Sequence, residues 1–246
     1  MQNFDFYPVF FIMPLDAIAN QLEKFAELQY FVEASAVIVS ALSGMIAARE
    51  KQLDIVGTYF IAFVTAFGGG TLRDLLLNRR PLFWVSHQEY PILIFVLSIL
   101  FLACSQRITP VKPLARRSFD LIDALGLALF SISGTSYALA DRIPAFIAVL
   151  FGVITGVFGG VLRDITLVQI PCIFRQSPLY ATCSFLGGWV YLLFLSFKLP
   201  PAFASATGFA TVVVMRMLAL HYNLSLPVLY TKDSPDTFSP LPRKDL

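Results

Sequence analysis

The stretch "GGGTLRDLLLNRRP" (residues 68–81) places three adjacent glycines directly before an Arg-Asp pair in an otherwise apolar segment. A second stretch, "FGGVLRDITLVQIP" (residues 158–171), repeats this phrase 90 positions later. The same offset aligns further identical residues without a gap from about residue 30 to residue 93: Ser43 with Ser133, Gly44 with Gly134, Thr65 with Thr155, and Tyr90 with Tyr180. Because these identities fall mainly on glycine, charged and polar positions, they indicate an internal duplication of one unit.

The composition is typical of an integral membrane protein. Hydrophobic residues make up 57% of the 246 residues, charged residues only 14%, and the mean hydropathy is +0.72. A soluble domain carries about 25% charged residues, so this chain lacks the polar surface that a water-soluble particle needs. The expected surroundings are a lipid bilayer. A net charge of +2 gives no reason to expect a nucleic-acid partner.

Apolar segments of nearly the length that crosses a bilayer, about 20 residues, recur along the chain. We expect seven of them, at residues 31–48, 55–77, 91–106, 119–140, 145–167, 179–197 and 201–221. The loops between them are short, so neighbouring helices should be antiparallel. The predicted fold is therefore an all-α membrane protein with seven transmembrane helices, built from two three-helix repeats and a seventh helix.

The two repeats should cross the membrane in opposite directions. Each contains an odd number of helices, so the second copy starts on the side opposite to the first, an inverted arrangement that recurs in transporters. Ten Lys and Arg residues fall on one side of the predicted spans and five on the other. Since positive charge is enriched in cytoplasmic loops, we expect the N-terminus outside and the C-terminus in the cytoplasm.

These boundaries divide the chain into six parts. We expect an N-terminal interfacial segment (1–28), a first three-helix repeat (29–106), a basic cytoplasmic linker (107–118), a second three-helix repeat (119–197), a seventh helix (198–222) and a disordered C-terminal tail (223–246).

The repeated glycines predict an irregularity in the second and fifth helices. Glycine costs up to about 1 kcal/mol relative to alanine inside a helix, and consecutive glycines favour a kink or a break. Backbone groups freed in this way are tolerated in a membrane only where they are buried in protein or line a wet cavity. The alternative is close helix packing through small residues, which we favour for the Ser-Gly pairs of the first and fourth helices. The candidate kink residues are Gly68, Gly69, Gly70, Gly159 and Gly160.

The repeated arginines need partners, because an unpaired arginine in a bilayer costs from about 3 to well over 10 kcal/mol. Glu33 and Arg73 should lie at similar depth, and Asp123 and Arg163 should meet near the opposite face. The sequence therefore predicts two ion pairs, with Asp74 and Asp164 as further acceptors. Either these pairs only fasten each repeat, or they stand at the two ends of a permeation path.

The pairing of the arginines separates two kinds of transport. If carboxylates neutralise them, a path lined by kink carbonyls, acidic side chains and the hydroxyl groups of Thr65, Thr155 or Thr71 would select cations. If Arg73 or Arg163 is free, it could hold the carboxylate of a small solute, as a carrier would require.

No catalytic or metal-binding pattern stands out in the sequence. The three cysteines lack C-x-x-C spacing, and the two histidines, His87 and His221, are far apart in the chain. Hydrolase, metalloprotease, nucleotide-binding and dinucleotide-binding motifs do not occur. We expect neither an enzyme nor a bound cofactor.

The doubled "GG-x-LRD" phrase, set in inverted three-helix units with a seventh helix, resembles the prokaryotic TRIC channels, a family also labelled with a glycine-transporter domain. The resemblance covers about residues 28–221 and implies a homotrimer in the bacterial inner membrane, with one pore for K⁺ or Na⁺ in each protomer. It also implies that the second and fifth helices are kinked at their glycines and line the pore. Phe158 stands where the first repeat has Gly68, so the two halves should differ. The alternative is a carrier for a small zwitterion such as glycine.

Overall fold

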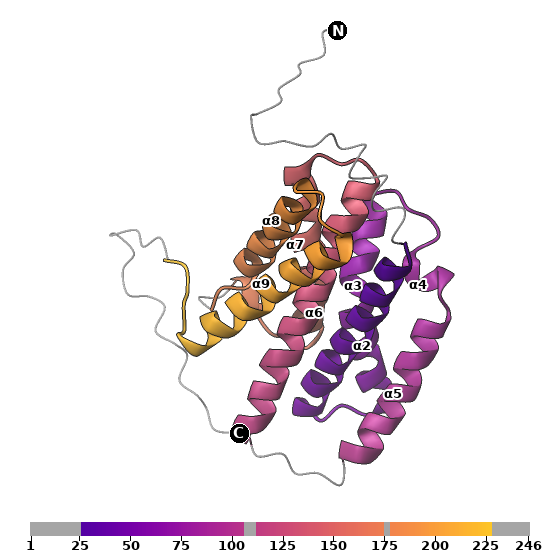
Figure 1. Cartoon of the computed structure of the whole chain (residues 1–246). Coiled ribbons are helices and arrows are strands. Elements are labelled where there is room, and N and C mark those ends of the chain that lie inside the picture. The colour runs from indigo at the N-terminus through magenta and orange to yellow at the C-terminus, as the bar shows by residue number, and fades with distance from the viewer. Residues whose placement is uncertain (1–25, 106–111, 175–177, 228–246) are drawn as a thin grey trace, which may run out of the picture.

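The computed structural model describes residues 26–105, 112–174 and 178–227 and is helical almost throughout (Figure 1). The expected interfacial segment at residues 1–28 and the expected tail at residues 223–246 lie largely outside these ranges. The first unit contains α2 (Ala26–Glu50), α3 (Ile55–Leu76), the short α4 (Phe83–Ser86) and α5 (Glu89–Ser105). The second unit contains α6 (Lys112–Ala140), α7 (Ala145–Thr166), the 3₁₀ turn η1 (Cys172–Phe174) and α8 (Ala181–Ser196), and α9 (Pro201–His221) follows it.

Five of the seven expected crossings have the length and hydropathy that a bilayer requires, namely α2, α3, α6, α7 and α9. The helices α5 and α8 are also apolar but shorter. Large apolar side chains such as Phe31, Val56 and Ile92 are exposed on the outside of the bundle, as lipid contact requires. The chain is therefore a membrane protein.

The duplication seen in the sequence extends to the helix boundaries. α3 and α7 begin and end 90 residues apart, and α2 and α6 end 90 residues apart. The turns that follow these helices also match. Gln52 and Arg142 adopt positive φ angles of 55° and 60°, and Asn78 and Val168 adopt 53° and 56°. A left-handed residue just after a helix ends its hydrogen-bond ladder in a compact turn.

The two units pack around the crossing of α3 and α7. α2 packs against α3 in the first unit, α6 packs against α7 in the second, and α2 also packs against α6. One apolar core lies mainly in the first unit and includes Met45 and Phe67, and another lies in the second and includes Val149 and Tyr191. α9 lies across α6 and α8 and covers the second unit (Figure 1).

The helix boundaries differ from expectation mainly at the start of α6. This helix begins at Lys112, not at residue 119, so residues 112–118 of the expected linker are helical. Its first turns carry Lys112, Arg116 and Arg117, and the long apolar run begins only afterwards. Hydropathy locates the part of a helix inside the bilayer, and a polar extension beyond it gives no such signal.

Candidate functional site

The site begins at the crossing of α3 and α7, where two glycines remove the side chains that would keep the backbones apart. A Cβ atom on Gly69 would overlap the carbonyl oxygen of Thr155, and a Cβ atom on Gly159 would overlap that of Thr65. Both glycines and both threonines are related by the 90-residue offset. The two helices therefore touch backbone to backbone at a near-symmetric contact that only glycine permits.

The glycines do not interrupt their helices, so of the kink or break that the sequence predicted, the break is excluded. α3 is helical from Ile55 to Leu76 and α7 from Ala145 to Thr166. The hydroxyl groups of Thr65 and Thr155 each donate to the carbonyl four residues earlier, at 2.6 Å. Close packing supplies enough contact to keep a glycine-rich segment helical, although its intrinsic preference is weak.

Packing also explains the glycines of the neighbouring helices, as the sequence suggested. A Cβ atom on Gly44 would lie 2.8 Å from the Cα atom of Ala62, and one on Gly134 would lie 2.9 Å from the carbonyl oxygen of Phe151. These glycines let α2 approach α3 and α6 approach α7. The helices α2, α3, α6 and α7 are thus closely packed at the crossing of α3 and α7.

Arg73 is the centre of a charged cluster in the first unit and is only 1% exposed. Its guanidinium group pairs with Glu33 at 3.0 Å and with Asp74 at 2.8 Å. Asp74 also accepts a hydrogen bond from the backbone N–H of Phe83 at 2.8 Å, and Glu33 accepts one from the Tyr137 hydroxyl at 3.1 Å. Every carboxylate in the cluster therefore has at least two donors.

Arg163 is the centre of the corresponding cluster in the second unit and is 4% exposed. It pairs with Asp123 at 2.7 Å and with Asp164 at 3.0 Å. Asp164 accepts a hydrogen bond from the backbone N–H of Cys172 at 3.2 Å, which matches the bond from Phe83 to Asp74. The predicted pairs of Glu33 with Arg73 and of Asp123 with Arg163 are thus both present.

Each arginine also donates to a serine of the other unit. Arg73 lies 3.4 Å from the hydroxyl oxygen of Ser133, and Arg163 lies 2.8 Å from that of Ser43. Sequence reasoning aligned these two serines but gave them no role. Their position at the same offset as the arginines was the signal that could have identified them.

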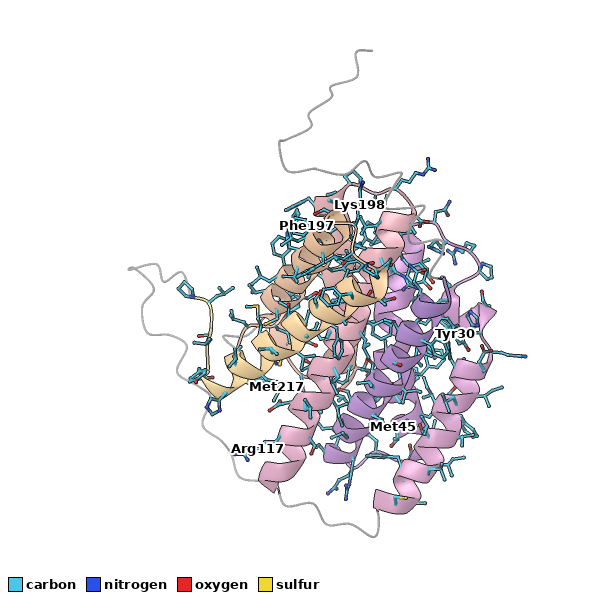
Figure 2. The ribbon with its side chains drawn as sticks, in the orientation of Figure 1. Tyr30, Met45, Arg117, Phe197, Lys198 and Met217 are labelled. Atoms are coloured by element: carbon cyan, nitrogen blue, oxygen red, sulfur yellow. The ribbon has the colours of Figure 1, made fainter. Side chains whose placement is uncertain are left out.

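The two clusters lie toward opposite ends of the bundle. Figure 2 shows Tyr30 at the upper end of α2 and Met45 near its lower end, with Arg117 at the lower end of α6. Glu33 is one turn from Tyr30, and Asp123 is fewer than two turns from Arg117. The Arg73 cluster therefore lies toward the upper end and the Arg163 cluster toward the lower end.

The upper cluster contains an aromatic side chain with no counterpart at the equivalent position of the repeat, although Phe119 lies over Arg163 in the lower cluster. The ring of Tyr137 lies between two guanidinium groups, 4.1 Å from that of Arg73 and 4.5 Å from that of Arg79. The offset of 90 pairs Tyr137 with Ala47 in the first unit. The sequence comparison did not identify Tyr137, because it looked for residues that are identical in the two repeats, and Tyr137 differs from its counterpart Ala47.

A narrow polar cavity lies beside the helix crossing, toward the lower cluster. Its volume is about 10 Å³, about enough for one water molecule, and its wall contains Asp123, Tyr180 and Thr65 together with glycines of α7. The complete lining is Ser40, Ser43, Thr65, Asp123, Leu127, Phe130, Gly156, Gly159, Gly160 and Tyr180. Of the residues singled out from the sequence for the site, the cavity brings together Thr65, Asp123, Gly159 and Gly160. Gly68 and Gly70 instead face Leu162 and Phe83.

The polar groups around the cavity are hydroxyl, carboxylate and backbone oxygens. Within the three described ranges, no group of three or more His, Cys, Asp and Glu side chains is placed to hold a metal ion. Oxygen atoms of this kind replace part of the hydration shell of a cation.

The family comparison matches the chain twice. The family model described as "Glycine transporter" matches residues 30–106 and again residues 120–196. The two matches begin 90 residues apart and coincide with the two helical units.

Among curated proteins, the inner membrane protein YadS of Escherichia coli is 34% identical over 201 residues, which cover 81% of this chain and 95% of YadS. A membrane protein of Vibrio cholerae is 34% identical over 200 residues, covering 81% of this chain and 82% of that protein.

Two solved structures share the architecture. A TRIC trimeric intracellular cation channel orthologue from Rhodobacter sphaeroides superposes with a TM-score of 0.74 at 30% identity, covering 80% of this chain and 99% of that one. A second structure, described in connection with conductance through TRIC cation channels, gives a TM-score of 0.71 at 31% identity and covers 83% of this chain and 98% of that one.

Proposed function

Because the chain belongs to the TRIC family, whose family model carries the description "Glycine transporter", we propose that it is a monovalent-cation channel with one pore in each protomer. The pore runs between the two units, past the crossing of α3 and α7. It carries K⁺ or Na⁺ and needs no cofactor. The protein works as a homotrimer in the inner membrane, with seven crossings arranged as two inverted repeats and with its C-terminus in the cytoplasm.

The observation that carries this proposal is the neutralisation of both buried arginines. Arg73 faces Glu33 and Asp74, and Arg163 faces Asp123 and Asp164, so each arginine meets two carboxylates. An unpaired arginine in a narrow path would repel cations. Two carboxylates around one guanidinium group leave an excess of negative charge, which attracts them.

The pore in this proposal has a narrow polar lower half and a closed upper half. The polar cavity beside Asp123 forms the lower half, and α3 and α7 bend at Gly68, Gly69, Gly70, Gly159 and Gly160 without losing their helical hydrogen bonds. The backbones meet at the narrowest point, beside Thr65 and Thr155, whose oxygens can accept from hydrated ions. Tyr137 and the Arg73 cluster close the upper half.

A carrier for a small zwitterion such as glycine is the second candidate, and the description of the family model is the observation in its favour. Such a carrier needs a free guanidinium group to bind the substrate carboxylate. Arg73 and Arg163 are both engaged by carboxylates of the protein, which favours the channel.

Planar-bilayer recording of the purified protein, with K⁺ on one side and Na⁺ on the other, tests the proposal. The channel predicts discrete currents that do not depend on glycine and a reversal potential set by the two cations. Saturable glycine exchange in liposomes without current would overturn the channel in favour of the carrier. The absence of both activities would overturn both candidates.

A further inference from the structure

Arg216 is a third buried arginine, and it comes from the helix that lies outside the two repeated units. It lies in α9 and is 5% exposed. One of its terminal nitrogens donates to the carbonyl oxygens of Pro178 and Leu179, at 2.9 and 2.8 Å. The guanidinium group thereby holds the segment that leads into α8.

The charge of Arg216 is held in a different way from the charges of Arg73 and Arg163. Within the described part of the chain, no carboxylate lies within ion-pair distance of Arg216, and its Nε atom has no hydrogen-bond partner. Two carbonyl dipoles stabilise the guanidinium group but do not cancel its charge. A positive charge buried in this way acts on nearby ions through protein of low dielectric constant, and only salt that enters the path screens it.

One aromatic ring separates this charge from the polar cavity. The guanidinium carbon of Arg216 lies 4.7 Å from the centre of the Tyr180 ring, and Tyr180 lines the cavity together with Asp123. The attraction between Arg216 and Asp123 accordingly contributes to the electrostatic environment of that carboxylate.

Among the described residues, no guanidinium group is found over Tyr90 as Arg216 is over Tyr180. Tyr90, the counterpart of Tyr180, packs against the rings of Tyr30 and His87, with centroids 6.1 and 5.3 Å away. The seventh helix thus adds a fixed cation to one half of a path whose two halves are built largely from repeated parts.

From this arrangement we infer that Arg216 makes the conduction path electrically asymmetric and causes its cation current to rectify. The inference rests on the proposed channel function. A fixed positive charge one aromatic ring away from the cavity lowers the local concentration of cations there. Cations that enter from the lower end meet this barrier first, whereas cations from the upper end meet it last.

Single-channel recording in symmetric KCl tests the inference. The quantity measured is the ratio of the larger to the smaller current at voltages of equal size and opposite sign, because this ratio does not depend on the direction of insertion. At about 50 mM salt we expect clear rectification in the wild type, and in Arg216→Gln a ratio that falls by about twofold or more toward unity. Glutamine keeps an N–H donor but carries no charge.

Two further variants separate charge from structure. Arg216→Lys keeps the charge and should keep the wild-type ratio. Lys51→Gln removes an exposed charge from the loop after α2, at the same end of the bundle, and should also leave the ratio unchanged. In the wild type itself, the ratio should approach unity at about 1 M KCl, where the Debye length is about 3 Å.

The outcomes distinguish the two proposals. A wild type without any cation current would overturn the proposed function and this inference together. A current whose rectification is the same in wild type, Arg216→Gln and Arg216→Lys would overturn the inference alone. If Arg216→Gln does not fold, the salt series decides, and rectification that persists unchanged at about 1 M KCl would overturn the inference.

Discussion

At the scale of single residues, the cost of burying a guanidinium group determines the surroundings of Arg73 and Arg163. Each is held by two carboxylates and by a hydroxyl oxygen of the opposite unit. A buried ion pair contributes little net stability compared with an apolar pair, but removing one partner leaves an uncompensated charge. The clusters are therefore sensitive to single substitutions.

Arg163→Ala should destabilise the protein by about 3–5 kcal/mol, because it leaves Asp123 and Asp164 buried without their partner. Thermal unfolding of the purified protein in detergent measures the change. The matched control is Arg79→Ala, which removes an exposed pair with Asp141 and should cost less than about 1 kcal/mol. Equal melting temperatures for the wild type and Arg163→Ala would show that the buried pair has no structural role.

Val168 carries backbone strain that its counterpart in the first unit avoids. Its φ angle is 56° and its side chain is 93% exposed, whereas the equivalent residue is Asn78, with a φ angle of 53°. A β-branched residue is disfavoured in this left-handed conformation and asparagine tolerates it. Val168→Asn should therefore stabilise the protein by about 1 kcal/mol.

The reverse substitution, Asn78→Val, is the matched control and should lower the stability by a similar amount. Chemical or thermal unfolding in the same detergent compares the two variants. A loss of stability in Val168→Asn would mean that the valine side chain makes a contact that outweighs the strain.

At the scale of secondary-structure elements, the crossing of α3 and α7 is the contact that defines the molecule. Gly69→Ala and Gly159→Ala should each destabilise the protein by about 1–3 kcal/mol or more, because the added methyl group overlaps a backbone carbonyl that cannot rotate away. Thermal unfolding measures the loss, and bilayer recording should show altered conductance.

The adjacent Gly160 provides the control for the crossing. A Cβ atom there would lie 3.2 Å from the Tyr180 hydroxyl oxygen, which is a tight but movable neighbour. Alanine also has a higher helix propensity than glycine, by about 1 kcal/mol. Gly160→Ala should therefore keep most of the stability, and a loss as large as that of Gly159→Ala would refute the special role of the crossing.

Near its end, α6 carries Tyr137 at the position where the equivalent helix α2 carries Ala47. In the proposed channel this ring closes the upper half, so Tyr137→Ala, which copies Ala47, should raise the open probability or conductance severalfold. Tyr137→Phe keeps the ring between Arg73 and Arg79 but loses the 3.1 Å bond to Glu33. If the bulk of the ring closes the path, the current of Tyr137→Phe should stay close to that of the wild type. Single-channel recording of Tyr137→Ala and Tyr137→Phe compares the two variants. An unchanged current in Tyr137→Ala would remove this residue from the closure.

At the scale of the whole molecule, the proposed assembly is a trimer of identical chains, each with its own pore. Native mass spectrometry of the detergent-solubilised protein should give a protein mass about three times the 27.3 kDa of one chain. Chemical crosslinking in native membranes should produce the same species. A protein that conducts as a monomer would refute the trimer but leave the pore in each protomer intact.

Much of the helical framework can be derived from the sequence. Residues 55–77, 145–167 and 201–221 were expected to be helical, and α3, α7 and α9 occupy these ranges to within one residue. The 90-residue offset also placed Glu33 beside Arg73 and Asp123 beside Arg163. Hydropathy depends on residues that are neighbours in the chain, and repetition depends on residues at a fixed offset. Both can therefore be recognised from the sequence without a structure.

The sequence alone left open whether the repeated glycines kink their helices or break them, and the helices are continuous. The local preference of glycine is to weaken a helix. Whether the helix stays continuous depends on the groups that pack against its glycines. Only the fold brings the carbonyl of Thr155 against Gly69 and that of Thr65 against Gly159.

The sequence by itself determined that this chain enters a membrane, that it is duplicated, and that its buried charges must meet. The duplication follows from identities at a fixed offset of 90 residues. The other two results follow from the free energy of transferring apolar and charged groups, which each residue carries wherever the chain places it. The tertiary structure alone decided that Tyr137 stands between two arginines and that Arg216 faces the cavity through Tyr180. Both features are exceptions to the repeat, and the contacts that create them join residues far apart in the chain, whose proximity depends on how the helices pack.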